Sequence, residues 1–268
     1  MLVSLLEMIF ILLFILGLAV GSFLNVLIYR LPRNLSIFGR SFCPHCKKKI
    51  AWHDNIPLLS FAILGGKCRY CRSPISLQYP IVELTTAILF VLVFLFPNES
   101  IKYQVLSIKY LVSLGYYLLI ISSLVAIFFI DLKHGIIPDK IVYPAVVISL
   151  FFLISQYLNI LISHFLSATA SFLFFFLLVL ITRGRSMGMG DVKLAFLMGL
   201  FLGFPKIVIA LYVAFLTGAA VSLILVLWGK KKFSGGTVPF GPFLVFGTLL
   251  AFFFGEVLLR LASPWLNF

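Results

Sequence analysis

The chain has 268 residues, of which 62% are hydrophobic and only 11% are charged, and its formal net charge is +13. Soluble domains carry about a quarter charged residues, so this composition excludes an ordinary soluble domain and predicts an all-α polytopic membrane protein. The positive charge would suggest nucleic-acid binding in a soluble protein, but in a membrane protein it orients the spans. We therefore expect contact with the lipid bilayer and no nucleic-acid partner.

About eight apolar segments are predicted to cross the membrane. They cover residues 5–29, 80–96, 110–130, 141–158, 160–182, 192–204, 207–228 and 238–261. The sixth is short for a bilayer that needs about 20 helical residues. No basic region precedes the first segment, and Glu7 lies near its start. We therefore interpret this segment as a retained span and not as a cleaved signal peptide.

Lysine and arginine are distributed unevenly between the two sides of these spans. If the polar loop at 30–78 is cytoplasmic, 17 of the 21 basic residues fall on the cytoplasmic side. Basic residues are enriched in cytoplasmic loops, so this orientation is the predicted one. An even number of spans then places both termini on the outer face.

All four cysteines of the chain lie in this loop, as two C-x2-C pairs separated by 21 residues. The pairs are Cys43 with Cys46 and Cys68 with Cys71. Four thiolates can surround Zn²⁺ tetrahedrally and leave no position for water, which predicts a structural, zinc-ribbon-like site. A reducing cytosol disfavours disulfides, although disulfides or a metal-free thiol cluster would use the same residues. A domain of about 45 residues buries little core, and a metal would compensate for that.

Three of the eight acidic residues are predicted to lie at one membrane boundary: Asp131, Asp139 and Asp191. An ionisable residue in such a place is costly and is a functional candidate. Two facing carboxylates can share one proton, so that one activates water while the other polarises a carbonyl. We predict that Asp131 and Asp191 hydrolyse a peptide bond in this way, without a catalytic metal.

Each aspartate also has a simpler interpretation. Asp191 could cap the helix that follows it, Asp139 could cap the fourth span, and Asp131 could be an interfacial anchor. The glycines before Asp191 favour chemistry, because Gly188 and Gly190 let the backbone approach a ligand closely.

A second backbone feature is expected at the cytoplasmic end of the last span. Pro239 and Gly241 belong to the stretch VPFGP, which we predict to line the substrate cleft and to pair with an extended substrate. The alternative is a turn that simply starts the last helix.

Five stretches, spread over nearly the whole chain, resemble the type IV prepilin leader peptidases, the bacterial branch of the GxGD membrane aspartyl proteases. They are GSFLNVLIYRLPR (21–33), GGKCRYCRSPISLQYPIVE (65–83), IDLKHGIIPD (130–139), MGMGDVKLA (187–195) and VPFGPFL (238–244). The resemblance implies that Asp131 and Asp191 are the catalytic pair and that Asp139 is structural. It also implies a bacterial inner-membrane enzyme, with its zinc loop and active site facing the cytoplasm, that removes the basic leader of prepilins or pseudopilins.

Many members of that family also methylate the new N-terminus with S-adenosylmethionine. The resemblance associates this activity with the zinc-bearing loop and with Gly66 and Lys67, although a turn before a zinc knuckle would explain those two residues equally well. It implies three parts: a first span (1–29), a cytoplasmic four-cysteine zinc-binding domain (30–79) and a multi-span protease domain (80–268).

Two rival functions are compatible with the same residues. A transporter or channel component would use the aspartates for proton or cation handling, and an inactive assembly scaffold would keep the fold without the reaction.

Several polar and small residues in the spans carry simpler predictions. We expect Asn25 to pair helices, Arg30 to snorkel to the interface, and Glu83 to pair with a basic loop residue or, alternatively, to touch substrate. Two glycine pairs at a spacing of four residues are expected to pack helices closely: Gly17 with Gly21, and Gly199 with Gly203.

Overall fold

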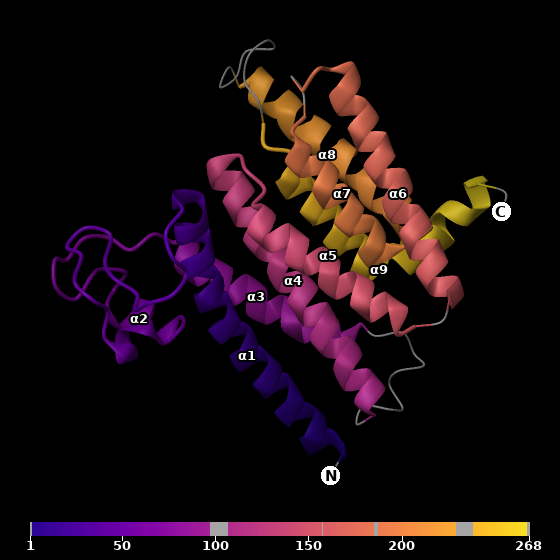
Figure 1. Cartoon of the computed structure of the whole chain (residues 1–268). Coiled ribbons are helices and arrows are strands. Elements are labelled where there is room, and N and C mark those ends of the chain that lie inside the picture. The colour runs from indigo at the N-terminus through magenta and orange to yellow at the C-terminus, as the bar shows by residue number, and fades with distance from the viewer. Residues whose placement is uncertain (1, 97–106, 157, 185–186, 229–237, 267–268) are drawn as a thin grey trace. The chain divides into compact units, whose positions relative to one another are not determined.

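A computed structural model describes residues 2–96, 107–156, 158–184, 187–228 and 238–266 (Figure 1). Some of the basic residues that enter the orientation count lie outside these ranges, and their placement is not described. They are Lys102, Arg185, Lys230, Lys231 and Lys232.

In the described ranges, eight long helices coincide with the eight predicted spans. They are α1 (Leu2–Arg30), α3 (Gln78–Leu95), α4 (Ile108–His134), α5 (Asp139–Ile154), α6 (Leu158–Ile181), α7 (Met189–Leu202), α8 (Lys206–Leu227) and α9 (Gly241–Leu266). Six are long and apolar enough to cross a membrane, whereas α5 has 16 residues and α7 has 14. At 1.5 Å per residue, α7 rises about 21 Å, less than the roughly 30 Å of the hydrocarbon core. The all-α architecture is confirmed for the described residues.

The described chain divides into two compact units, Met1–Ala126 and Ile127–Phe268. In the first unit α1 and α3 pack side by side (Figure 1). A Cβ added to Gly17 would lie 2.5 Å from the Cα of Ala87, and one added to Gly21 would lie 2.6 Å from the Cα of Glu83. Any larger residue would force these helices apart, so the prediction that this glycine pair packs helices is confirmed.

The end of α1 corrects one prediction. Arg30 does not snorkel towards the interface, because its side chain is only 5% exposed. Its guanidinium donates hydrogen bonds to the carbonyls of Ser36 (3.0 Å), Phe38 (2.9 Å) and Arg40 (3.0 Å). The loop after α1 has no helix or sheet to satisfy these carbonyls, and the five donors of a guanidinium can serve several at once. Arg30 therefore holds the first part of the loop against the end of α1.

The predictions for two further residues of this unit, Asn25 and Glu83, have different outcomes. Asn25 pairs helices as predicted, because its Nδ2 donates to the Tyr79 carbonyl of α3 at 3.0 Å. The predicted pairing of Glu83 with a basic residue is wrong. Its carboxylate instead accepts the Leu58 backbone N–H at 2.9 Å, because that loop residue reaches the α1–α3 interface and the loop lysines do not.

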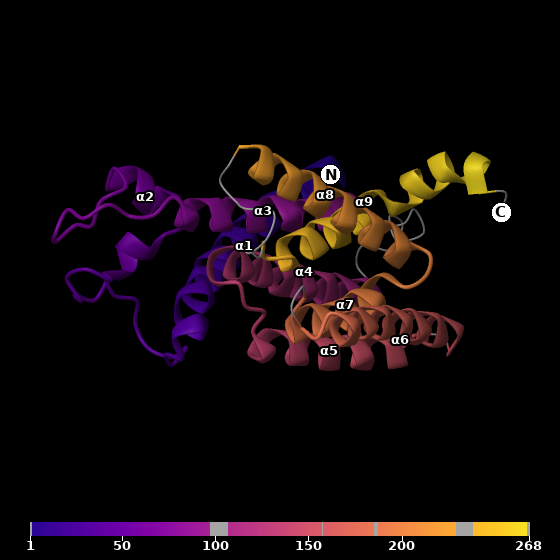
Figure 2. The same ribbon diagram turned by 90° about the horizontal axis from the view of Figure 1, so that it is seen from above.

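In the second unit α7 is the central helix and packs against α5, α6, α8 and α9 (Figure 2). Five of its apolar side chains are fully buried: Val192, Leu194, Leu197, Met198 and Leu200. A Cβ on Gly199 would overlap the backbone of Ala168 in α6, so the predicted close helix packing is confirmed there. Gly203 ends α7 with φ +65° and lies against His164 of α6.

Candidate functional site

The loop between α1 and α3 brings the four cysteines together. One ligand atom from each of them lies within 4.8 Å of the others, and the Sγ atoms of Cys43 and Cys71 are 3.8 Å apart. A tetrahedral zinc site with bonds of about 2.3 Å has sulfur–sulfur edges of about 3.8 Å. The cluster therefore has the dimensions of a four-thiolate metal site, and it could hold a metal ion.

The two cysteine pairs form equivalent turns. In the first, the Cys43 N–H donates to the Lys48 carbonyl (3.0 Å) and the Lys47 N–H donates to the Cys43 carbonyl (2.9 Å). In the second, the Arg72 N–H donates in the same way to the Cys68 carbonyl (3.0 Å). Lys47 and Arg72 both have positive φ, +60° and +58°. Such turns direct both sulfurs of a pair to one point, as a metal site requires.

Hydrogen-bond donors around the sulfurs act towards the thiolate form, but with opposite net results at Cys71 and Cys46. Hydrogen bonds from the Ser73 hydroxyl and backbone lower the pKa of Cys71 to about 6. The Lys48 N–H acts in the same direction on Cys46, but burial and the neighbouring Cys43 and Cys71 sulfurs outweigh it and raise the pKa of Cys46 to about 11. Without a metal the four thiols cannot all ionise together, because neighbouring thiolates repel one another. A bound cation would offset this repulsion.

Gly66 and Lys67 lie directly before the second turn. Gly66 has φ +67°, and its carbonyl accepts the Ile75 N–H at 2.7 Å. Lys67 forms an antiparallel bridge with Pro74. These contacts account for the glycine as part of the turn, and the predicted cofactor role of the two residues remains a prediction.

Asp131 and Asp191 both lie in the second unit and are both buried. Asp131 is in the last turn of α4 and is 4% exposed, and Asp191 is in the first turn of α7 and is 8% exposed. They are close enough for their negative charges to interact. The fold thus brings together two carboxylates that are 60 residues apart in the sequence.

Asp191 also has the capping contacts that the simpler interpretation predicts. Its Oδ2 accepts the Gly188 N–H at 3.2 Å, while its own N–H donates to the Gly188 carbonyl at 3.2 Å. This reciprocal arrangement fixes the rotamer of Asp191 and uses one carboxylate oxygen. Capping is therefore compatible with the predicted chemical role of Asp191.

The two glycines before Asp191 differ in their surroundings. A Cβ added to Gly190 would lie 2.9 Å from the Cβ of Ile137 in the α4–α5 loop, whereas one added to Gly188 would make only ordinary contacts. Packing against Ile137 is enough to require glycine at position 190. The predicted place of both glycines in the substrate cleft remains a prediction.

The stretch VPFGP begins α9, whose first residue is Gly241. The Gly241 backbone N–H is directed at the Asp131 carboxylate, and Asp131 Oδ2 is buried without a hydrogen-bond partner. A Cβ added to Gly241 would lie 2.5 Å from that oxygen. Pro239 precedes this contact and is half-buried.

We predict that Gly241→Val lowers peptide cleavage by at least about tenfold while the amount of folded protein in the membrane is unchanged. The new side chain would push the Asp131 carboxylate from its position, and a displacement of about 1 Å can cost a hundredfold in rate. Cleavage is compared with that of Gly115→Val, because a Cβ at Gly115 meets no atom within 4 Å. Normal turnover by Gly241→Val would contradict the assigned contact.

Asp139 has a partner that its position in the sequence does not reveal. It starts α5, and its carboxylate accepts from Lys193 Nζ of α7 at 2.7 and 3.0 Å. The pair joins the first residue of α5 to α7, the helix that carries Asp191. Sequence reasoning missed Lys193, since only its place two residues after Asp191 marks it.

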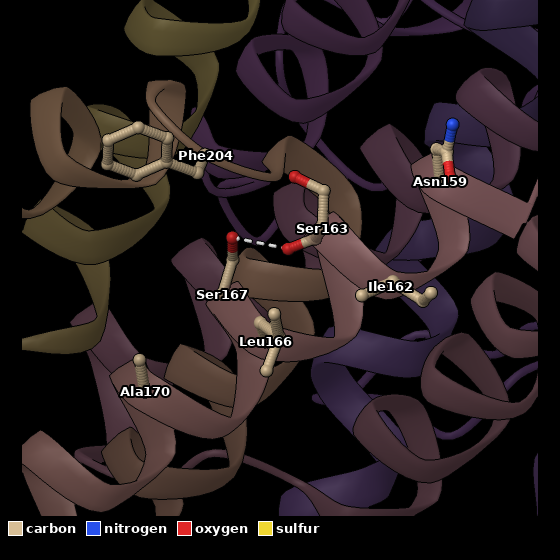
Figure 3. Close-up of a pocket in the computed structure, with 7 residues that line it drawn as sticks. All are labelled: Asn159, Ile162, Ser163, Leu166, Ser167, Ala170 and Phe204. Carbon is tan, nitrogen blue, oxygen red and sulfur yellow. Dashed lines mark hydrogen bonds between the residues drawn. The ribbon is translucent and has the colours of Figure 1, made fainter.

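A groove that includes neither aspartate lies along α6 (Figure 3). It is lined by Asn159, Ile162, Ser163, Leu166, Ser167, Ala170 and Phe204. Ser167 satisfies its hydroxyl within α6, by donating to the Ser163 carbonyl at 2.7 Å. None of the seven side chains is an acid or a base, so this groove lacks the groups that general acid–base hydrolysis needs.

Two family descriptions match the sequence. The bacterial peptidase A24 N-terminal domain matches residues 15–96, and the type IV leader peptidase family matches residues 118–223. No solved structure matches the chain.

Similar proteins extend over most of the chain and are named "Prepilin leader peptidase/N-methyltransferase". One from Legionella pneumophila is 34% identical, and the match covers 91% of this chain and 91% of its own. One from Aeromonas hydrophila is 34% identical and covers 94% of this chain and 92% of its own. One from Vibrio cholerae is 31% identical, and the match covers 92% of this chain and 98% of its own.

These matches do not support the transporter or assembly-component alternative. The apolar helices and the family together describe a multi-pass membrane protein. With similarity over nine-tenths of its length, this chain belongs to the type IV leader peptidase family.

Proposed function

We propose that this chain is a membrane aspartic endopeptidase that removes the leader peptide of type IV prepilins or pseudopilins. The observation that carries the proposal is the pair of buried carboxyl groups, Asp131 in the last turn of α4 and Asp191 in the first turn of α7, which lie within electrostatic range of each other. The names of the relatives supply the substrate class.

The reaction needs one ionised and one protonated carboxyl group. The ionised carboxylate takes a proton from water as the water oxygen attacks the scissile carbonyl carbon, and the protonated carboxyl gives its proton to the carbonyl oxygen. When the C–N bond breaks, the leaving nitrogen receives the proton held by the first group. The second group recovers its proton from a hydroxyl of the tetrahedral intermediate. Both groups return to their starting states, and a new amine is released.

Four further residues complete the proposed cleft. The glycines Gly188 and Gly190 lie beside Asp191, and Gly241 lies against Asp131 with Pro239 before it. Gly188 is exposed and Gly190 and Pro239 are partly exposed, so an extended substrate backbone would pair with main chain at these positions. The ion pair of Asp139 with Lys193 supports this arrangement from the α5 side, as a structural contact.

The four cysteines would hold a structural Zn²⁺. The dimensions of the cluster and the donors around its sulfurs support this metal, and four protein ligands leave it no open position for chemistry. Its contribution is to stabilise a domain of 30–79 that has little core of its own.

The second activity we assign is methylation of the new amine. S-adenosylmethionine would supply the methyl group, and the double name of the relatives supports this assignment. The exposed Lys67 and the left-handed Gly66 are the residues we assign to that cofactor, in the zinc-bearing domain.

We place the protein in the bacterial inner membrane, with the zinc domain and the carboxylates facing the cytoplasm. The excess of basic residues in 30–78 supports this orientation. Residues 1–29 would form the first span and 80–268 the protease domain.

The test uses membranes that contain the full chain and a prepilin-like substrate with a basic leader. The mass of the product reports both activities, because leader removal shortens the substrate and methylation adds one methyl group to the new end. We expect loss of the leader, and methylation only when S-adenosylmethionine is added. A substrate that stays intact while the folded protein is present would reject the proposed function.

A further inference from the structure

The interface of α1 and α3 contains a buried carboxylate whose contacts are all neutral. Glu83 is only 7% exposed. It accepts the Leu58 backbone N–H at 2.9 Å and a hydrogen bond from the Ser22 side chain. None of the ion pairs formed by the described residues includes Glu83. An ionised carboxylate buried in this way is costly until a positive group joins it.

A second acceptor without a partner lies in the same interface. Asn25 is 2% exposed, and its Oδ1 has no hydrogen-bond partner. The orientation of the amide is set by its surroundings, because Nδ2 must face the Tyr79 carbonyl that accepts from it at 3.0 Å. Oδ1 is therefore the atom left without a donor, and such orphaned acceptors are rare in buried positions.

The two acceptors are neighbours along the helix pair. Ser22 and Asn25 are three residues apart on α1, and Tyr79 and Glu83 are four apart on α3, so each pair shares one helix face. One inter-helix contact joins Ser22 to Glu83, and the other joins Asn25 to Tyr79. Glu83 and Asn25 therefore lie at neighbouring turns of the same α1–α3 interface.

The chemistry of this pair points to an ammonium group. An ionised carboxylate and an amide oxygen can only accept hydrogen bonds, and a primary ammonium offers three donors. A divalent cation would require about six oxygen ligands, more than these side chains supply.

We propose that Glu83 and Asn25 form a binding site for a primary ammonium group, namely the new N-terminus that leader removal creates. This inference deepens the proposed function and rests on it. Binding at this site would hold the amine of the processed substrate beside the zinc-bearing loop. Leu58 of that loop already donates its backbone N–H to the Glu83 carboxylate.

The experiment measures equilibrium binding of two peptides to the purified full-length protein. Both peptides reproduce the apolar start of a processed pilin, and one has a free amine while the other is N-acetylated. We expect the wild type to bind the free amine at least about tenfold more tightly, since hydrogen bonds between charged groups are strong. Glu83→Gln keeps an acceptor for Leu58 but loses the charge, and should bind both peptides equally.

Thr86→Val is the matched control. Thr86 is fully buried one turn further along α3, and its hydroxyl bonds only to the Val82 carbonyl of its own helix at 2.8 Å. This variant should keep the wild-type preference. A wild type without preference for the free amine, or a Glu83→Gln variant that retains it, would overturn the proposal.

Two further arms separate the possible explanations. S-adenosylmethionine carries its own ammonium group, so a Glu83→Gln variant that loses affinity for this compound and not for the peptide would overturn the assignment to the peptide. Prepilin cleavage by the wild type is measured in parallel. Preference for the free amine without any cleavage would support the ammonium site and reject the proposed function. Cleavage without preference for the free amine would support the proposed function and reject the ammonium site.

Discussion

Replacing either Asp131 or Asp191 with asparagine should reduce prepilin cleavage by at least about a thousandfold. Asparagine keeps the size and polarity of the side chain but can neither accept the proton of water nor donate an acidic proton. Each general acid or base typically contributes about 10² to 10⁴ in rate, and here the two groups act on one bond. The measurement is the rate of leader removal in membranes that contain equal amounts of each variant.

Asp139→Asn is the control for this experiment. Asp139 is exposed and paired with Lys193, and an exposed ion pair contributes at most about 1 kcal/mol, so its loss should change cleavage only severalfold. The zinc content of all three variants should be the same, because none of these residues lies in the loop that carries the four cysteines. If Asp131→Asn or Asp191→Asn cleaves at a near-normal rate, the two-aspartate mechanism is wrong and Asp139 becomes the next candidate.

Replacing Cys43 with serine should remove the zinc and unfold the loop between α1 and α3. Cys43 is the buried member of the cluster, 6% exposed, and its sulfur lies 3.8 Å from that of Cys71. The free energy with which small domains bind structural zinc, about 10–16 kcal/mol, is also free energy of folding for those domains. The measurements are bound zinc per chain and the rate of proteolysis within residues 34–77.

His45→Ala is the matched control for the cysteine variant. His45 is exposed and lies between the two cysteines of the first pair. The variant therefore tests whether loss of a different potential metal ligand in the same turn has the same effect as loss of Cys43. We expect one zinc per chain and unchanged resistance to protease. A Cys43→Ser protein that still binds one zinc tightly would contradict the four-cysteine site. Loss of all free thiols on purification, without zinc, would instead support disulfides.

The sequence by itself determined the parts of this protein that depend on neighbouring positions in the chain. The apolar runs predicted all eight long helices, because the backbone of a segment in lipid must satisfy its own hydrogen bonds. The two C-x2-C pairs predicted the thiol cluster, since a short turn can direct two sulfurs to one point.

The aspartates show where that reasoning reaches its limit. Topology predicted that Asp131 and Asp191 lie at one boundary, and the fold brings them within electrostatic range. The contact of Gly241 with Asp131 could not be predicted, because it depends on how the start of α9 packs against the end of α4.

Tertiary structure alone decided which partner each buried polar group takes. Arg30 holds loop carbonyls and does not snorkel, Glu83 accepts a backbone N–H and does not meet a lysine, and Asp139 meets Lys193. A polar group buried in an apolar interface bonds to whatever donor or acceptor the packing brings within about 3 Å. That choice depends on the packing of segments distant in sequence, and the local pattern of residue types does not contain it.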